Sequence, residues 1–417
     1  MSQPDGMIDK RSVTDAVSRR EVIRSGVSAV IFSILTPTTG NAAEQAPPQQ
    51  GRTNVPQHEQ RRAPMYAFEE ISGVHLEITS QCNISCPQCP RNLNGGAVNP
   101  SLSLTELHLG DIREILPASF VRQLRTLRMC GNYGDPIVAR DTLEAFRYFR
   151  QCNHDIELKL HTNGSARSAN WWGSLAEVID TCVFGIDGLA DTNHLYRRGA
   201  NWHRVMASAQ AFIAAGGRAE WAFLAFEHNE HQVENAERLS RDLGFSRFTV
   251  KKTSRFYHNG RLNTRYPVRN ANGDIEYYLR PPSEARFQND GVTQLVSITR
   301  RQSYADYQAS TPISCKAATE RSIYISAEGL VLPCCWLGAL HARPGDDWNS
   351  DLNELISRLP EGMNSINAKL HPVAEIVAGP FFQTEIPGGW LENSSSRLRT
   401  CARSCGSYDI LNSQQGV

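Results

Sequence analysis

Short apolar segments alternate with amphipathic segments along the chain from Gly73 onward. The apolar segments have the length of strands, and the amphipathic ones repeat their apolar residues at helical spacing. Alternating strands and helices are typical of a parallel sheet with right-handed crossovers. The pattern therefore predicts an α/β fold of six β-then-α units, arranged as an open or a closed barrel. We expect its strands at 74–79, 124–130, 156–161, 181–186, 219–226 and 247–251.

Polar residues mark where the intervening helices are expected to begin. Ser103-x-x-Glu106 and Asp141-x-x-Glu144 have the form of capping boxes, in which two side chains satisfy free amides at a helix start. Asn201 has the character of an N-cap residue and predicts another helix start. In parallel α/β sheets the ligand site lies at the carboxyl ends of the strands, so residues that follow the predicted strands are the candidates for function.

The strand–helix alternation stops near residue 255. The stretch 266–278 turns at Asn272-Gly273 and predicts a β-hairpin. Beyond Thr311 the chain carries cysteines, is rich in loops and lacks strong periodicity, which predicts a small domain organised by metal. The expected domains are therefore a core at 65–255, a hairpin-containing connector at 256–310 and a cysteine-bearing domain at 311–417.

The first 64 residues differ from the rest of the chain. Ser18-Arg19-Arg20 precedes a short apolar run at 27–35 and a series of small residues up to Ala43, which resembles a twin-arginine export signal. The apolar run is too short to span a bilayer, and no membrane span is predicted elsewhere. Residues 44–62 are rich in Gln, Pro and Arg and are typical of a disordered linker. The alternative is an over-long gene start, with Met65 as the true initiator.

The net charge excludes some classes of partner, and the cysteine content suggests bound metal. The 43 basic and 43 acidic residues give a formal net charge of zero, so neither nucleic acid nor an anionic membrane is indicated as a partner. Scattered arginines such as Arg197 and Arg198 are expected on a solvated surface. Eleven cysteines are unusual, and their clustering in a chain of 417 residues favours metal ligation over a disulfide framework.

Three of these cysteines form a C-x3-C-x2-C loop directly after the first predicted strand. Cys82, Cys86 and Cys89 could ligate three irons of a four-iron, four-sulfur (4Fe-4S) cluster and leave the fourth iron without a protein ligand. A catalytic metal centre requires such an open position, whereas a structural one is closed. The alternative is a zinc knuckle, although zinc normally takes a fourth ligand and paired C-x2-C spacing.

Glycine-containing loops follow three later strands, and each short motif is weak by itself. Glycines let the backbone approach a ligand, and a carboxylate in such a loop can accept a hydrogen bond from an ammonium group. Because the loops fall in order at successive strand ends, we predict that together they bind a cofactor. The candidate residues are Gly131, Gly134, Asp135, Pro136, Thr162, Asn163, Gly164 and Asp187.

Five further cysteines lie in the C-terminal segment. Four thiolates would complete the shell of a second iron–sulfur cluster, and a structural zinc site with four thiolates is the alternative. The available residues are Cys315, Cys334, Cys335, Cys401 and Cys405. The remaining cysteines, Cys130, Cys152 and Cys182, are expected to behave as small apolar residues.

In order, spacing and placement these motifs resemble those of the radical S-adenosylmethionine (SAM) superfamily. The stretch 82–91 resembles the branch with SPASM or shortened twitch C-terminal domains. The resemblance covers 70–255 well and 311–405 more loosely. It implies a partial (β/α)6 parallel barrel followed by a small auxiliary-cluster domain. The chain departs from the family pattern at Gln88, where many members have an aromatic residue, and at Gly185, where serine is usual.

The resemblance also implies an activity and its cofactors. One 4Fe-4S cluster, at Cys82, Cys86 and Cys89, would reductively cleave SAM to a 5′-deoxyadenosyl radical that abstracts a hydrogen atom from a substrate C–H bond. The spacing Cys315-x13-Gly-x4-Cys334 resembles the opening of twitch domains and favours Cys334 over Cys335. The metal ligands implied for one auxiliary cluster are Cys315, Cys334, Cys401 and Cys405.

The substrate and the partners follow only from this resemblance. Members with this layout oxidise sugar alcohols or modify peptides, so dehydrogenation of a polar small molecule and peptide modification are both open. A low-potential electron donor such as flavodoxin or ferredoxin is implied. Because the periplasm is oxidising, a cytoplasmic location is favoured over twin-arginine export to the periplasm. The alternatives from other classes are a non-catalytic iron–sulfur electron carrier or sensor and a zinc-stabilised binding protein.

Overall fold

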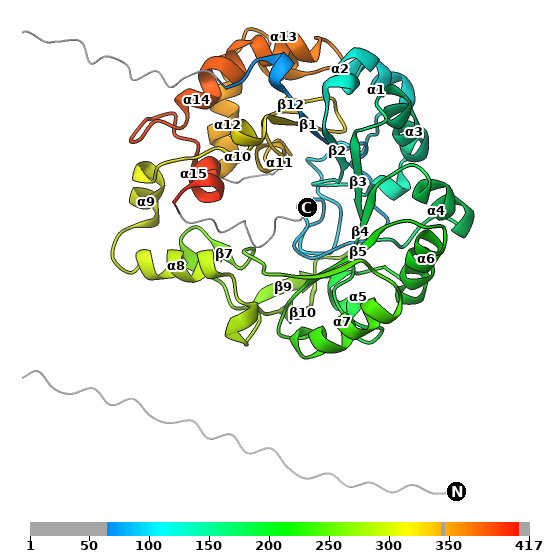
Figure 1. Ribbon diagram of the computed structural model, residues 1–417. Helices are drawn as coiled ribbons and strands as arrows, with labels where there is room; N and C mark the ends of the chain where they lie inside the picture. Colours follow the sequence, from blue (N-terminus) through cyan, green and yellow to red (C-terminus); the bar gives the residue numbers. More distant parts are fainter. Residues whose placement is uncertain (1–64, 343–346, 408–417) are drawn as a thin grey trace, which may run out of the picture. The chain divides into compact units, whose positions relative to one another are not determined.

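The computed structural model describes residues 65–342 and 347–407, and its central element is an eight-stranded sheet (Figure 1). Along the sheet the strand order is β12-β11-β1-β2-β3-β4-β5-β6. All neighbouring pairs from β11 to β6 are parallel, and β12 is antiparallel to β11. The strands are β1 (Gly73–Leu76), β2 (Thr126–Met129), β3 (Glu157–Thr162), β4 (Thr181–Gly185), β5 (Ala219–Leu224), β6 (Arg247–Lys251), β11 (Ser322–Ile325) and β12 (Val331–Leu332). The six predicted strands and the predicted α/β class with parallel pairing are therefore confirmed.

Helices connect the strands and pack their apolar faces on the sheet. Phe146 and Phe149 of α3, Trp172 of α4 and Phe212 of α6 are fully buried in one core cluster with the strands. Burying such aromatic side chains is the main favourable contribution to folding here. The connecting helices are α1 (Leu109–Ile115), α2 (Ala118–Gln123), α3 (Thr142–Cys152), α4 (Ala169–Ala176), α5 (Asn193–Tyr196), α6 (Trp202–Ala214) and α7 (Val233–Asp242).

Two of the predicted helix starts are correct and one is wrong. Asn201 caps α6 by accepting a hydrogen bond from the backbone nitrogen of Arg204 (3.0 Å), and α3 begins directly after Asp141. The capping box predicted at Asp141 is wrong, however, because its carboxylate does not cap α3 and accepts from the backbone nitrogen of Leu109 instead (3.1 Å). The helix expected at Ser103 begins instead at Leu109. The intervening residues pair with the loop after β1, through a bridge between Thr79 and Glu106. This long-range pairing overrides the local capping signal.

The connector contains the predicted hairpin. Strand β9 (Tyr266–Arg269) pairs antiparallel with β10 (Ile275–Leu279), and Gly273 in the turn has a φ of +91° that favours glycine. Before the hairpin lie β7 (Tyr257–His258) and β8 (Arg261–Leu262), which also pair antiparallel. After it follow α8 (Asp290–Ile298) and α9 (Tyr304–Ser310).

The C-terminal segment contains more regular structure than its sequence suggests. Strand β11 extends the central sheet next to β1, with Gly73 opposite Ser322, so this segment shares the sheet of the predicted core. Its residues Ile323 to Ile325 are buried. The helices here are α10 (Lys316–Glu320), α11 (Cys335–Gly338), α12 (Asp347–Ser357), α13 (Val373–Ala378), α14 (Ile386–Gly388) and α15 (Arg399–Cys405).

Some predictions concern residues that the structure does not describe. The twin-arginine pattern and the linker, within residues 1–64, lie outside the described residues, as do 343–346 and 408–417. Across residues 65–342 and 347–407, no helix has the length and apolar character needed to cross a membrane. The domain boundaries at 65–255, 256–310 and 311–417 stay a prediction.

Candidate active site

The three clustered cysteines lie in the loop that follows β1, beyond the carboxyl edge of the sheet. All three are free thiols, and they pack in an apolar cluster with Ile84 and Phe256. Burial raises the pKa of each thiol, that of Cys86 to about 11. The thiols are therefore protonated near neutral pH when no metal is bound, and iron would have to displace these protons on binding.

Each of the three sulfur atoms meets one polar group from a different strand-end segment. The Nδ2 of Asn163 donates to the Sγ of Cys82 (3.8 Å), and the guanidinium of Arg197 donates to the Sγ of Cys86 (3.9 Å). The Cys89 thiol donates to the carbonyl oxygen of Asn132 (3.7 Å). The loops after β2 and β3, predicted from sequence as one site, therefore meet the cysteine loop.

Asp135 positions the loop after β3. One carboxylate oxygen accepts from the hydroxyl of Thr162 (2.8 Å) and the backbone nitrogen of Ile137 (3.1 Å). The other accepts from the backbone nitrogen and the Nδ2 of Asn163 (both 2.7 Å). A carboxylate has about four acceptor positions, so these bonds occupy its capacity. The role predicted for Asp135, accepting from an ammonium group, would require releasing one of them.

The remaining residues of the Thr-Asn-Gly element hold the turn together. Thr162 accepts a hydrogen bond from the backbone nitrogen of Gly164 (3.0 Å), and Gly164 has a φ of +69° that a side chain would strain. The amide of Asn163 therefore reaches Cys82 from a fixed turn. Pro136 begins a short 3-10 helix after Asp135 and is buried.

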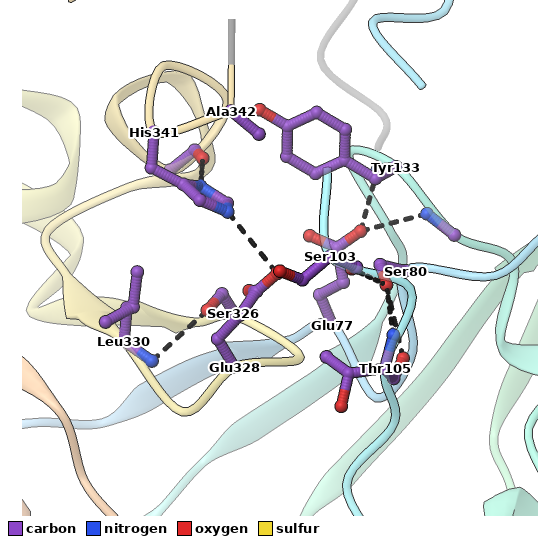
Figure 2. A network of polar contacts seen from close by, with 12 residues as sticks. Glu77, Ser80, Ser103, Thr105, Tyr133, Ser326, Glu328, Leu330, His341 and Ala342 are labelled. Atoms are coloured by element: carbon purple, nitrogen blue, oxygen red, sulfur yellow. Dashed lines mark hydrogen bonds and ion pairs between the residues drawn. The ribbon is translucent and has the colours of Figure 1, made fainter. Parts of the chain in front are cut away.

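The glycines of the loop after β2 serve close backbone packing. A Cβ atom at Gly134 would overlap the carbonyl oxygen of Thr79, and one at Gly131 would overlap the carbonyl oxygen of Gly134. The carboxylate of Glu77 accepts hydrogen bonds from the backbone nitrogens of Tyr133 (2.7 Å) and Gly134 (3.0 Å). Figure 2 shows Glu77 beside Tyr133. The loop is thus fixed against the end of β1.

Glu77 is a site residue that the sequence analysis missed. Its side chain is buried, and its second carboxylate oxygen accepts from the hydroxyl of Tyr324 in β11. Burial raises its pKa, while the hydrogen bonds from Tyr324, Tyr133 and Gly134 act in the opposite direction. An acidic residue in a predicted strand of the central sheet was the available signal, because buried charges are retained only where they are hydrogen-bonded.

The structure corrects the prediction for Arg197, which lies in the segment after β4. Its Nε donates to the carboxylate of Asp187 at 2.6 Å, and the Asp187 side chain is 1% exposed. Arg197 therefore belongs to the site and not to a solvated surface. A Cβ at Gly185 would overlap this guanidinium, so the glycine that stands in place of the usual serine leaves room for it. The neighbouring Arg198 pairs with Glu276 of the hairpin.

Gln88, the other departure from the family pattern, is buried beside Cys89. No described residue forms a hydrogen bond with its amide nitrogen or oxygen. An unpaired buried amide destabilises a protein, so such groups are usually satisfied by water or a ligand. The amide is therefore available to a bound molecule.

The C-terminal cysteines line a separate small cavity. Cys315, Cys334, Cys401 and Cys405 all contribute to its wall, together with the apolar side chains of Trp336, Ile386 and Trp390. Cys335 is absent from this wall, and its carbonyl oxygen accepts from the Nδ2 of Asn132 instead (2.8 Å). Burial raises the pKa of Cys315, Cys334 and Cys401, that of Cys315 to about 12.

The side chains of the two cysteine groups are not gathered around one point. In residues 65–342 and 347–407, no three His, Cys, Asp or Glu side chains converge on a point where one metal ion would sit. A zinc site needs four ligands around one ion, whereas the thiolates of a four-iron cluster each bind a different iron. A zinc ion would therefore require the side chains to move together.

The loop after β2, which contains Gly131 and Gly134 and is called the glycine loop below, also connects the two cysteine groups. Besides the Asn132 bond to Cys335, the hydroxyl of Tyr133 donates to the carbonyl oxygen of Ala339, just after α11 (2.7 Å). Figure 2 shows the Tyr133 ring beside His341, at a centroid distance of 5.3 Å. One loop therefore fixes α11 against the end of β1.

The chain is similar to two curated proteins and to several solved structures. The chain is 24% identical over 293 residues to the PqqA peptide cyclase of Bradyrhizobium diazoefficiens, covering 66% of this chain and 70% of that protein. It is 26% identical over 131 residues to the 7,8-dihydro-6-hydroxymethylpterin dimethyltransferase of Methanocaldococcus jannaschii, covering 30% of this chain and only 24% of that protein. Among solved structures, anSMEcpe with bound AdoMet has 12% identity and a TM-score of 0.47, with 80% and 85% of the two chains covered. No family model matches the chain.

The parallel sheet and the thiols beyond its carboxyl edge define an α/β protein with a cysteine-bearing site. Both curated relatives are radical SAM enzymes, and this chain is similar to them. The resemblance inferred from the sequence motifs is therefore confirmed.

Proposed function

We propose that the protein cleaves SAM reductively at a 4Fe-4S cluster held by Cys82, Cys86 and Cys89, and abstracts a hydrogen atom from a substrate C–H bond. The observation that carries this proposal is the meeting of three free thiols with Asn132, Asn163 and Arg197 at the carboxyl edge of the sheet. When bound, the cluster would supply one electron to SAM through its iron without a protein ligand.

The side chains around the cysteines would stabilise the deprotonated sulfurs. Hydrogen bonds to sulfur and nearby positive charge tune the potential of an iron–sulfur cluster. Asn163 and Arg197 are placed to provide both, and the apolar cluster around Cys86 would exclude water. An electron carrier would need none of the strand-end loops, so their convergence favours an enzyme.

We propose a second cluster bound by Cys315, Cys334, Cys401 and Cys405. The cavity lined by these four side chains supports this set, and it favours Cys334 over Cys335. This cluster would accept an electron from the substrate radical or help to anchor the substrate. The glycine loop, which contacts both cysteine groups, would keep their positions fixed relative to each other.

Two substrate classes are open for this enzyme, a peptide and a polar small molecule. The curated relative that matches most of this chain is named as a peptide cyclase, which supports a peptide. The connector and its cavity, described below, support a small molecule. We propose that a low-potential donor such as flavodoxin or ferredoxin supplies the electron and that the enzyme works in the cytoplasm.

The test is SAM cleavage by anaerobically reconstituted protein. With dithionite and SAM, we expect 5′-deoxyadenosine as a product and about eight irons per chain. Cys86→Ala should abolish the product, whereas the control Cys152→Ala, at the end of α3, should retain it. Undiminished product from Cys86→Ala would refute the assignment. Zinc without iron would favour a binding protein, and iron without SAM cleavage would favour an electron carrier.

A further inference from the structure

A cavity of about 320 Å³ lies between α8 and the segment that follows β6. Its wall is mostly apolar and includes Phe256, Leu262, Pro281 and Val292. A volume of this size is at the lower end of the range for sites that bind small molecules, which are typically apolar with a few polar groups. The proposed function assigns no role to this cavity.

One segment connects the cavity to the cysteine loop. Phe256 lines the cavity, is buried, and belongs to the same apolar cluster as Cys86 and Ile84. The preceding residue, Arg255, turns the other way and donates to the hydroxyl of Tyr196 in that cluster (2.8 Å). Phe256 therefore belongs both to the wall of the cavity and to the apolar cluster that contains Cys86.

The charged groups in the wall of the cavity indicate the charge of a ligand that would bind there. No acidic residue lines the cavity, and its one charged lining residue is Arg300, which is exposed two residues beyond α8. In the part of the chain that the structure describes, no carboxylate forms an ion pair with Arg300. An unpaired guanidinium at the rim of an apolar cavity favours a ligand with an anionic group at one end.

We propose that this cavity binds the substrate, and that the substrate is a small organic anion with an apolar body. The body would lie against Phe256, Val292 and the prolines, and its carboxylate or equivalent group would reach Arg300. The identity of the ligand as the substrate rests on the proposed function. The chemistry of the cavity does not, so the two can be tested separately.

The test uses two probes with the same apolar body. 8-Anilinonaphthalene-1-sulfonate carries an anionic group, and N-phenyl-1-naphthylamine is its uncharged counterpart. Isothermal titration calorimetry on the full chain with its clusters loaded should show one site for each probe. Arg300→Gln should weaken binding of the sulfonate about threefold, as expected for an exposed ion pair, and leave the uncharged probe unchanged.

A matched pair of variants on α8 locates the site. Ser297 lines the cavity and Gln294 does not, and both are exposed, so tryptophan is tolerated at either position. Ser297→Trp should weaken both probes roughly tenfold or more by filling the cavity, whereas Gln294→Trp should bind them as the natural chain does. Equal binding by the two tryptophan variants would overturn the proposal, as would a loss of both probes in Arg300→Gln.

SAM cleavage and probe binding are two separate properties of the protein and can fail independently. SAM cleavage by the natural chain is measured on the same preparations, with no probe present. Cleavage without probe binding would overturn the cavity proposal alone. Probe binding without SAM cleavage would overturn the proposed enzyme and leave a binding site for apolar anions.

Discussion

The ion pair between Arg197 and Asp187 gives the sharpest prediction about stability. The two groups are 2.6 Å apart, and their side chains are 23% and 1% exposed. At an effective dielectric constant of about 20, two unit charges at this separation attract each other by about 6 kcal/mol. Desolvation of both groups offsets roughly half of this attraction, so the net stabilisation is about 3 kcal/mol.

Arg197→Met should therefore lower the free energy of unfolding by about 3 kcal/mol at neutral pH, because it leaves Asp187 buried and unpaired. Asp187→Asn should lower the free energy of unfolding by about 2 kcal/mol, since it leaves the guanidinium of Arg197 unpaired at a partly exposed position. The double variant should lose about 2 kcal/mol less than the sum of the two single losses. Urea unfolding of the cluster-free chain, followed by tryptophan fluorescence, measures all four proteins of this cycle.

The pH dependence supplies a second readout of the same pair. Burial raises the pKa of Asp187, and Arg197 opposes that rise. Without Arg197 the pKa of Asp187 should rise further. A carboxyl group whose pKa is raised in the folded state stabilises that state at low pH, and this stabilisation is lost as the pH increases through the folded pKa. The deficit of Arg197→Met should therefore shrink on acidification. Strictly additive losses in the cycle, or a deficit independent of pH, would refute the reasoning.

Three further predictions concern the neighbouring parts of the site. Gly134→Ala should cost about 3 kcal/mol, because the added Cβ overlaps a backbone carbonyl oxygen; urea unfolding measures this loss. Cys334→Ala should lower the iron content of reconstituted protein by about four per chain, whereas Cys335→Ala should leave it unchanged. Burial lowers the pKa of His341, but Glu328, the carbonyl oxygen of Gly338 and Glu77 together raise it above its ordinary value. The stabilisation by the ion pair of His341 with Glu328 is therefore complete below a pH of about 6.5 and is lost as the pH rises through the folded pKa. His341→Gln should therefore destabilise more at pH 6 than at pH 9, measured by urea midpoints.

Each of these predictions has a control or a contradicting outcome. Gly110→Ala places a Cβ in open space within α1 and should not destabilise the protein. Loss of iron in Cys335→Ala, with retention in Cys334→Ala, would reverse the ligand assignment. For His341→Gln, an equal loss of stability at both pH values would mean that the side chain acts through packing and not through its charge.

The parts of the fold that the sequence predicts are those governed by local pattern. The six core strands and the hairpin at Asn272-Gly273 were recovered because alternation, strand length and turn residues are visible along the chain. Strand β11 was missed because it lies outside the strand–helix alternation and is stabilised by pairing with β1, far away in sequence. The helix expected at Ser103 failed for the same reason, since Glu106 pairs with Thr79.

For the candidate site, too, the sequence predicts some features and not others. The loops at Gly134, Asn163 and Asp187 were located because motifs at successive strand ends must meet at one edge of a parallel sheet. Their individual contacts could not be predicted. Arg197 looks like a surface residue until Asp187 is known to be its partner, and the acceptor capacity of Asp135 is visible only in its hydrogen bonds.

The contacts of the glycine loop imply that the two cysteine groups are not independent sites. The carbonyl oxygen of Asn132 accepts from Cys89, and the side chain of the same residue donates to the backbone beside Cys334. Glu77 holds the backbone of this loop and also bonds to Tyr324 in β11, which carries the C-terminal segment. A displacement of α11 would therefore move the residue that contacts Cys89, because the hydrogen bonds on both sides of Asn132 are made by one short segment.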